Sequence, residues 1–391
     1  MPQYTDRLAV PPGNPEYILL VDDSPANLRL LSQILGERGY GVRAATSGPR
    51  ALASIELTPP DLILLDIRMP EMDGYEVCQQ LKANPRTADI PILFISALDE
   101  IQDKMRAFSA GGLDYITKPF QLEEVIARVE THLALRRLQR NLERANQRME
   151  QELALAAQVQ ASFMQRTLPE TPGWQISVAL IPARMTSGDF YDVIRLPTGK
   201  LGLLIADVVD KGVGAALYMA MSCALLRAYT GEHPDNPDLA CQAVNERLLA
   251  YATADQFVTL FLGVLDPESG TLVYSNAGHN PPILLRAVEP EQVTLLRNTG
   301  MPLGVEESAL WPALQVQMAP GDVLVMYTDG VTDAENVDGA WYEMPRLIAV
   351  VKSSRGSTAQ ALRDAILDDV QRFTRDAVQA DDMALVVLVR E

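Results

Sequence analysis

The chain has 391 residues, of which 48% are hydrophobic and 21% charged, a composition typical of a globular protein with two or three domains. Its net charge of −18 argues against a nucleic-acid partner, because DNA binding depends on Lys and Arg contacts with phosphate. The three cysteines (Cys78, Cys223 and Cys241) have no metal-ligand spacing and suit buried thiols in a reducing compartment. No signal pattern opens the sequence and no apolar run reaches the ~20 residues of a membrane span, so we expect a cytoplasmic protein without membrane contact.

The first part of the chain has the pattern of an α/β domain. Residues 1–15 contain a proline-rich stretch and are expected to form a flexible leader. Between residues 16 and 134, apolar runs of strand length alternate with segments of helical period, which predicts a doubly wound parallel sheet. Helices are expected near residues 26–38, 49–57, 74–83 and 101–110, and a further one is expected to open at Gln121.

Four of the predicted strands deliver a polar group at their carboxyl ends. Asp22 and Asp23 follow the first of them, and Asp66, Ser96 and Lys118 stand at or just after the others. Because the carboxyl ends of parallel strands meet at one edge of a sheet, we expect these groups to lie together. Three carboxylates can hold a hard divalent cation, and a hydroxyl and an ammonium can hold phosphoryl oxygens. The arrangement therefore predicts transfer of a phosphoryl group onto Asp66.

A long helix is expected to follow this domain. No Gly or Pro occurs between residues 120 and 169, and an apolar or small side chain recurs at every seventh position there: Leu135, Leu142, Met149, Ala156 and Phe163. With charged residues on the flanks, this repeat predicts a coiled-coil linker over residues 135–167 and a homodimer formed through it. A helix that packs on its own domain is the alternative.

Residues 168–391 change character again and form the last predicted domain. Short alternating strands are separated by Gly, Pro and Asp turns, and helices interrupt them, which suggests an α/β sandwich. Strands are expected near residues 175–180, 201–206, 258–265, 272–276, 283–286, 322–327 and 384–389, and helices near 213–230, 238–253 and 358–374.

This domain has an acidic set of its own, placed at strand ends and beside glycines: Asp189, Asp207, Asp329, Asp381 and Asp382. Taken singly, each is more often a turn or cap residue. Carboxylates that converge from different strands are, however, what a two-metal oxygen site for Mg²⁺ or Mn²⁺ requires. Zinc is disfavoured, because the region has two histidines and no paired cysteines.

Residues 16–134 resemble the receiver domain of bacterial response regulators over their whole length. The likeness includes the segments Met69-Pro-Glu-Met-Asp-Gly74 and Lys118-Pro-Phe120 as well as the polar groups at the strand ends. The resemblance implies a five-stranded sheet and an Asp66 that accepts phosphate from a partner histidine kinase. A degenerate receiver that only dimerises is the alternative.

The same resemblance implies roles for the residues around Asp66. A Mg²⁺ ion would be held by the carboxylates of Asp22, Asp23 and Asp66 and by the backbone carbonyl of Arg68. Ser96 and Lys118 would bind the phosphoryl group, and Tyr115 would be the aromatic side chain that rotates on activation.

Residues 158–391 resemble the sporulation and stress-response branch of the PP2C-type serine/threonine phosphatases. The likeness rests on long motifs in the family's order: residues 188–192 (GDFYD), 207–216 (DVVDKGVGAA), 257–260 (FVTL), 276–281 (NAGHNP), 300–304 (GMPLG), 327–332 (YTDGVT) and 381–383 (DDM). It implies two antiparallel sheets flanked by helices. Two positions depart from the family pattern: Thr186-Ser187 replaces Val-Gly, and Val209-Asp210 replaces Ser-Gly.

The phosphatase resemblance implies a ligand set for two Mg²⁺ or Mn²⁺ ions. It consists of Asp207 as the bridging ligand, the carbonyl of Val208, Asp189, Asp329 and one of Asp381 and Asp382, with Asp381 favoured. A water activated by the two cations would attack phosphorus in line, without a covalent enzyme intermediate.

These observations predict a response regulator whose output is a metal-dependent serine/threonine phosphatase controlled by phosphorylation of Asp66. By resemblance, the substrate is a phosphorylated anti-sigma-factor antagonist. The alternative is a non-catalytic scaffold that binds such partners under the control of the receiver. Loss of one of the four principal aspartates would favour the scaffold, and all four are present.

Overall fold

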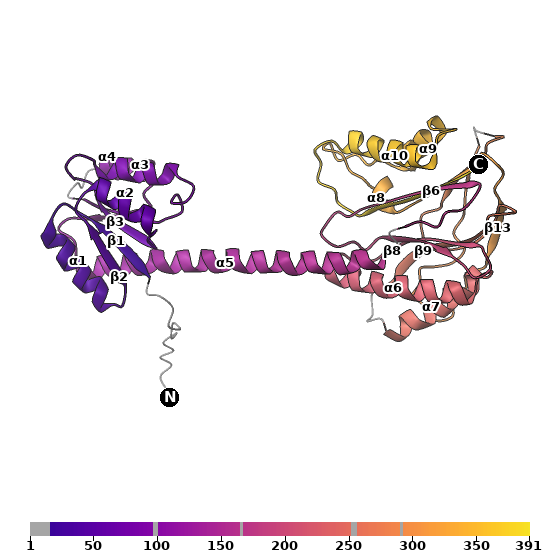
Figure 1. Cartoon of the computed structure of the whole chain (residues 1–391), viewed down its shortest axis with the longest axis horizontal. Helices are drawn as coiled ribbons and strands as arrows, with labels where there is room; N and C mark the ends of the chain where they lie inside the picture. Colours follow the sequence, from indigo (N-terminus) through magenta and orange to yellow (C-terminus); the bar gives the residue numbers. More distant parts are fainter. Residues whose placement is uncertain (1–15, 97–100, 165–166, 252–255, 290–291) are drawn as a thin grey trace. The chain divides into compact units, whose positions relative to one another are not determined.

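The computed structural model describes residues 16–96, 101–164, 167–251, 256–289 and 292–391, so the predicted leader (residues 1–15) lies outside the described residues. By the contacts within it, the chain divides into two compact units, residues 1–148 and 149–391. Each unit is described by itself below. Figure 1 shows the elements with their labels.

The first unit is built on a parallel sheet. Its strands pair in the order β2-β1-β3-β4-β5, and every neighbouring pair is parallel. Their bounds are β1 (Tyr17–Val21), β2 (Gly41–Ala45), β3 (Leu62–Asp66), β4 (Ile92–Ser96) and β5 (Asp114–Thr117). The helices are α1 (Pro25–Glu37), α2 (Gly48–Leu57), α3 (Gly74–Ala83), α4 (Ile101–Ser109) and the start of α5 (Leu122–Phe163). This confirms the predicted doubly wound five-stranded domain.

Sequence explains these elements locally. All five residues of β3 and all five of β4 are buried, as expected for central strands of a parallel sheet that is covered on both faces. Helix α3 begins with a capping box, in which Asp73 accepts a hydrogen bond from the backbone of Glu76 and Glu76 accepts one from the backbone of Asp73. Because all five strands run parallel, their carboxyl ends, with the polar residues that stand there, lie at one edge of the sheet.

The predicted long helix is present as α5, which is continuous for 42 residues. Val125, Val129 and Leu133 belong to the core of the first unit, whereas Leu138 and Leu142 are 67% and 63% exposed. The exposed apolar positions fit the predicted coiled coil, but the dimer stays a prediction. The domain limits at residues 134/135 and 167/168 also stay predictions. Helix α5 runs through the first of them without a break.

The second unit contains two antiparallel sheets, with the strand orders β13-β10-β9-β8-β7 and β12-β11-β14-β15-β6. The strands are β6 (Trp174–Ile181), β7 (Phe190–Arg195), β8 (Leu201–Val208), β9 (Val258–Asp266), β10 (Thr271–Ala277), β11 (Ile283–Leu285), β12 (Val293–Leu295), β13 (Leu314–Gln317), β14 (Val323–Tyr327) and β15 (Met383–Arg390). The helices are α6 (Val213–Glu232), α7 (Pro237–Tyr251), α8 (Asp329–Thr332), α9 (Met344–Ser353) and α10 (Ala359–Thr374).

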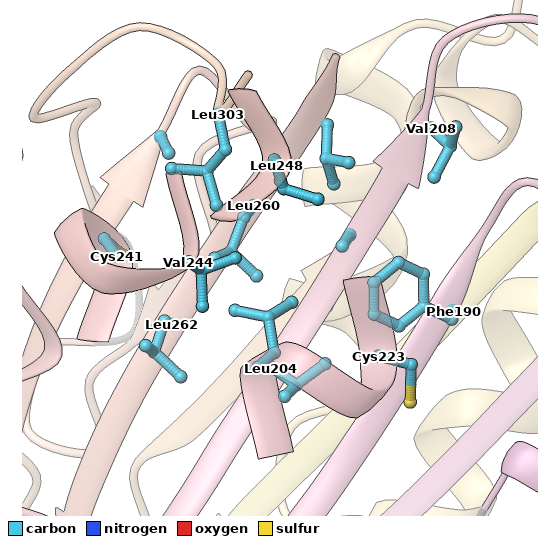
Figure 2. Close-up of a cluster of buried hydrophobic side chains, with 14 of the residues drawn as sticks. Phe190, Leu204, Val208, Cys223, Cys241, Val244, Leu248, Leu260, Leu262 and Leu303 are labelled. Carbon is cyan, nitrogen blue, oxygen red and sulfur yellow. The ribbon is translucent and has the colours of Figure 1, made fainter. Parts of the chain in front are cut away.

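The two sheets and their helices form four layers. Helices α6 and α7 pack on the first sheet, with side chains such as Cys223, Val244 and Leu204 in the shared core (Figure 2). A second cluster, which includes Phe261 and Leu324, fills the space between the sheets, and α9 and α10 cover the outer face of the other sheet. The predicted sandwich of two sheets flanked by helices is confirmed.

Strands β7, β12 and β13 and helices α8 and α9 are present although they were not among the predicted elements. No strand was expected at residues 190–195, but these residues form the edge strand β7. Its alternation is obscured because Asp192 is buried there and pairs with Arg227 at 2.6 Å. In addition, α6 is long and apolar enough to meet a length-and-hydropathy criterion for a membrane span, contrary to expectation. Its buried face packs in the α6/α7 core, which explains the apolar composition.

Candidate functional site

The polar groups of the first unit converge at the carboxyl edge of the parallel sheet, as predicted. Carboxylate oxygens of Asp22, Asp23 and Asp66 all lie within 4.8 Å of one another. Lys118 donates hydrogen bonds to Asp22 at 2.9 Å and to Asp66 at 2.8 Å. The edge is therefore an acidic pocket in which one ammonium bridges two of three carboxylates.

Burial and charge shift the protonation of this edge. Burial raises the pKa of Asp66, and hydrogen bonding and the charge of Lys118 offset part of that effect. Burial alone would lower the pKa of Lys118, but its hydrogen bonds with Asp66 and Asp22 outweigh burial, and the net direction is upward. Lys118 is thus held as a cation against the Asp66 carboxylate.

The remaining predicted receiver residues occupy the same edge or its margin. Ser96 is buried at the end of β4, and the backbone of Arg68 hydrogen-bonds Asp66. Tyr115 lies on β5 with its ring at an edge-to-face angle to Phe108, and the ring centroids are 6.0 Å apart. A shallow hollow beside the edge is lined by Asp23 and Arg68.

In the second unit, the predicted acidic residues come from four separate segments. Asp189 precedes β7, Asp207 lies near the end of β8, Asp329 opens α8 directly after β14, and Asp381 precedes β15. Asp189 shares a side-chain hydrogen bond with Asp207, and the charge of Asp381 acts on both Asp207 and Asp329. These four residues do not form a trio as compact as the one in the first unit within the described part of the chain. They form a wider chain of carboxylates.

The protonation of this chain of carboxylates reflects mutual repulsion in a buried setting. Burial, followed by the charge of Asp207, raises the pKa of Asp189 well above its usual range. Burial, followed by the charge of Asp329, raises the pKa of Asp207 to about 7. Burial and the charge of Asp381 raise the pKa of Asp329. Without a cation, these carboxyls compete for protons.

The two final aspartates have different environments. Asp382 is buried, and its two oxygens accept hydrogen bonds from the backbone N–H groups of Ala183 at 2.7 Å and Gly188 at 2.8 Å. Asp381 is half-exposed and faces a cation, because Lys211 donates to it at 2.9 Å. Asp382 therefore fixes the backbone beside Asp189, while Asp381 forms an ion pair with Lys211.

Two side chains that the sequence did not mark as site residues hold the loop carrying Asp189. The Gln160 amide, near the end of α5, accepts a hydrogen bond from the backbone N–H of Ser187 at 3.0 Å and donates one to the Ser187 carbonyl. Thr328 donates to Asp189 at 2.5 Å. In the sequence, Gln160 differs from its neighbours only as a polar residue outside the apolar seven-residue repeat. Such residues are common on exposed helices, so the sequence alone does not single it out.

Backbone geometry explains the glycines and one departure of the motif. A Cβ at Gly330 would lie 1.9 Å from the Asp382 carbonyl oxygen, and one at Gly188 would lie 3.1 Å from the Val208 carbonyl oxygen. Asp210, which replaces a family glycine, has φ of +85°. This left-handed conformation explains why glycine is usual there, and Asp210 adds an exposed carboxylate at the price of strain.

Comparisons with known proteins agree with this geometry. Residues 18–130 match the family described as "Response regulator receiver domain", and residues 197–391 match "Stage II sporulation protein E (SpoIIE)". Protein IcfG of Synechocystis sp. is 30% identical over 266 residues, which are 61% of this chain and 41% of that protein. RpaA of the same organism, a DNA-binding dual master transcriptional regulator, is 47% identical over 116 residues, which are 30% of this chain and 48% of that protein. The chain thus spans less than half the length of both relatives.

A solved structure supports the second fold independently. The SiaA-PP2C domain of Pseudomonas aeruginosa superposes with a TM-score of 0.56 at 17% identity, covering 63% of this chain and 99% of that one. At this identity the likeness concerns the fold alone, and the family match supplies the assignment. The chain therefore combines an N-terminal response regulator receiver domain with a C-terminal SpoIIE-family domain of the PP2C phosphatase type.

Proposed function

We propose that this protein is a response regulator in which phosphorylation of Asp66 controls a metal-dependent protein serine/threonine phosphatase. The observation that carries the proposal is the chain of four carboxylates, Asp189, Asp207, Asp329 and Asp381, on a fold of the PP2C type. A non-catalytic scaffold would have no need to keep these acidic groups together in a buried setting, where their repulsion costs stability.

The residues at the receiver edge fit a Mg²⁺ ion. Carboxylate oxygens within 4.8 Å of one another are hard ligands of the kind that Mg²⁺ prefers, and the carbonyl of Arg68 would complete the set. The ion would neutralise the phosphoryl oxygens during transfer from a histidine kinase. Asp66 would act as the acceptor, Lys118 would pair with the new phosphoryl charge, and Ser96 would donate to its oxygens. Tyr115 would be the switch residue.

The carboxylates of the phosphatase domain fit two divalent cations, Mg²⁺ or Mn²⁺. Burial, followed by the charges of neighbouring carboxylates, raises the pKa values of Asp189 and Asp207, as expected at a binuclear site where protons replace the metals. Asp207 would bridge, with the Val208 carbonyl and Asp189 on one side and Asp329 and Asp381 on the other. The cations would supply Lewis-acid activation of water and phosphate. Asp381 is the favoured ligand of the final pair, and Asp382 would position Gly188, because each of its oxygens already accepts a backbone hydrogen bond.

Helix α5 is the proposed route of control. Its first turns belong to the core of the receiver, and Gln160 near its end holds the loop that precedes Asp189. Arg227 adds a second anchor, because it pairs with Asp192 and donates to the Phe163 carbonyl at 3.2 Å. A rotation or displacement of α5 would therefore change the position of Asp189 and, with it, metal binding.

We further propose the partners that this design needs. The kinase would be a histidine kinase, and the substrate would be a phosphorylated anti-sigma-factor antagonist in the cytoplasm. The exposed apolar residues Leu135, Leu138, Leu142 and Met149 would pair two copies of α5 in a coiled coil. In a homodimer each receiver would have a second receiver beside it, and phosphorylation could change α5 through the contact between the two.

The substitution Asp329→Asn tests whether the phosphatase site and the phosphorylation site at Asp66 act separately. Removing this carboxylate takes away a predicted metal ligand, so we expect Mn²⁺-dependent hydrolysis of p-nitrophenyl phosphate to fall to background. Phosphorylation of Asp66 by a small phosphodonor should persist in the same variant. Asp338→Asn, an exposed aspartate of the same domain, is the matched control and should keep full activity. Loss of both reactions in the Asp329 variant would contradict the assignment of separate sites.

The metal-free phosphatase domain should lose stability as pH rises. Asp207 binds its proton more tightly in the folded chain, with a pKa of about 7 against 3.8, so its favourable contribution is present at low pH and disappears as pH rises through about 7. Trp174, Trp311 and Trp341, the three tryptophans, all lie in the second unit and report its urea unfolding by fluorescence.

We expect the unfolding midpoint in EDTA to decrease between about pH 5 and about pH 8, and Mn²⁺ to restore it. Asp207→Asn, which cannot ionise, should flatten the dependence. A midpoint that rises over this range in the unmodified chain but not in the variant would contradict the argument.

Gln160→Ala should lower the phosphatase activity, although Gln160 is not a predicted metal ligand. Gln160→Ala frees the Ser187 backbone, and loss of a residue that orients a ligand typically costs about 10- to 100-fold in metal affinity or activity. We expect a higher Mn²⁺ requirement and a lower maximal rate. Gln158→Ala, on the exposed side of the same helix, is the control. Equal effects of the two substitutions would point to a general change in the helix instead.

A further inference from the structure

A pocket of about 290 Å³ adjoins the phosphatase carboxylates. Asp381 and Gly330, the neighbour of Asp329, form part of its lining. The rest comes from Ile181 at the end of β6, residues 333–335 after α8, helix α10 and the segment leading to β15. This volume lies at the small end of the range for ligand sites, roughly 300 Å³ upward, and is large enough for one long side chain. The pocket is therefore placed to receive a residue close to the group that is dephosphorylated.

The pocket has apolar walls and an acidic rim. Ile181, Leu367 and Met383 contribute the walls. Asp333 and Glu335 are exposed at its edge, and neither forms an ion pair with a cation in the part of the chain that the structure describes. Asp381 differs, because Lys211 already neutralises it. Two uncompensated carboxylates above an aliphatic wall match a side chain with an aliphatic stem and a cationic head.

The walls of the pocket are fixed in place. Gln379 donates to the carbonyls of Ile181 at 2.9 Å and Asp381 at 2.7 Å, which anchors the segment before β15. Glu335 lies at the base of a short hairpin, bridged to Trp341. A preformed pocket loses little conformational entropy on binding, which favours a role in recognition.

We propose that this pocket binds a lysine or arginine side chain of the phosphoprotein substrate, so that a basic residue near the phosphorylated serine or threonine selects the substrate. The proposal rests on the proposed phosphatase function and adds a specificity-determining residue, Glu335. The local charge argues in the same direction, because an anionic side chain would be repelled from this acidic rim.

The test uses the full chain with Mn²⁺ and fluorescent peptides that carry a non-hydrolysable phosphoserine phosphonate. One arginine is moved through the positions flanking the phosphonate, and the other positions are neutral. Binding is followed by fluorescence anisotropy. We expect arginine at one position to lower Kd about tenfold relative to alanine, the size of one charge-assisted contact.

Glu335→Gln should reduce that advantage to below about threefold, as expected when one of the two facing charges is removed. The control is Glu307→Gln, which removes an exposed glutamate of the same domain outside the pocket lining and should keep the full advantage. Absence of an arginine preference, or a preference that Glu335→Gln leaves unchanged, would overturn the proposal.

Hydrolysis of p-nitrophenyl phosphate, measured on the same samples, separates this inference from the proposed function. This small ester has no side chain to fill the pocket, so Glu335→Gln should leave its rate unchanged. If the ester is not hydrolysed but arginine-dependent binding still requires Glu335, the proposed activity fails and the pocket assignment holds. If the ester is hydrolysed and the arginine preference is absent, the activity holds and the pocket assignment fails.

Discussion

Repulsion among buried carboxylates is the constraint on which the phosphatase site depends. Asp189, Asp207 and Asp329 are brought together with their pKa values raised, and the fold must hold them against that repulsion. It does so through the Thr328 hydroxyl on Asp189, the Gln160 amide on the adjacent backbone and the Lys211 ammonium on Asp381. Such a site is satisfied either by protons or by cations, which ties stability, metal binding and activity together.

The receiver deals with the same problem differently. There one ammonium, that of Lys118, lies between Asp22 and Asp66 and offsets part of the repulsion without a metal. A phosphoryl group on Asp66 would bring additional negative charge to an ammonium that already has two partners. The rearrangement this causes would begin at the carboxyl edge of the sheet, from which α5 departs after β5. In the receiver the ammonium thus lies between two carboxylates, whereas in the phosphatase domain Lys211 pairs with the half-exposed Asp381.

Features that neighbouring residues determine could be predicted from the sequence, and features that depend on contacts between distant residues could not. The runs that form β3, β4 and β14 are continuous and apolar, and they were found together with the aspartates that follow them. Strand β7 was missed, because its buried Asp192 pairs with Arg227, 35 residues away. Asp381 and Asp382 look alike in sequence, and their distant partners distinguish them: Lys211 for Asp381, and the backbone donors at Ala183 and Gly188 for Asp382. The pocket beside Asp381 is likewise invisible in sequence, since separate segments form it.

Coupling between the two domains is the central claim, and one comparison of rates tests it most directly. The initial rate of Mn²⁺-dependent hydrolysis of p-nitrophenyl phosphate should be measured with and without beryllofluoride, which mimics the phosphoryl group on Asp66. The account predicts a rate that changes with beryllofluoride in the unmodified chain and stays constant in the Asp66→Asn variant, which cannot hold the mimic. An identical rate in all four samples, with beryllofluoride binding demonstrated in the unmodified chain, would contradict it.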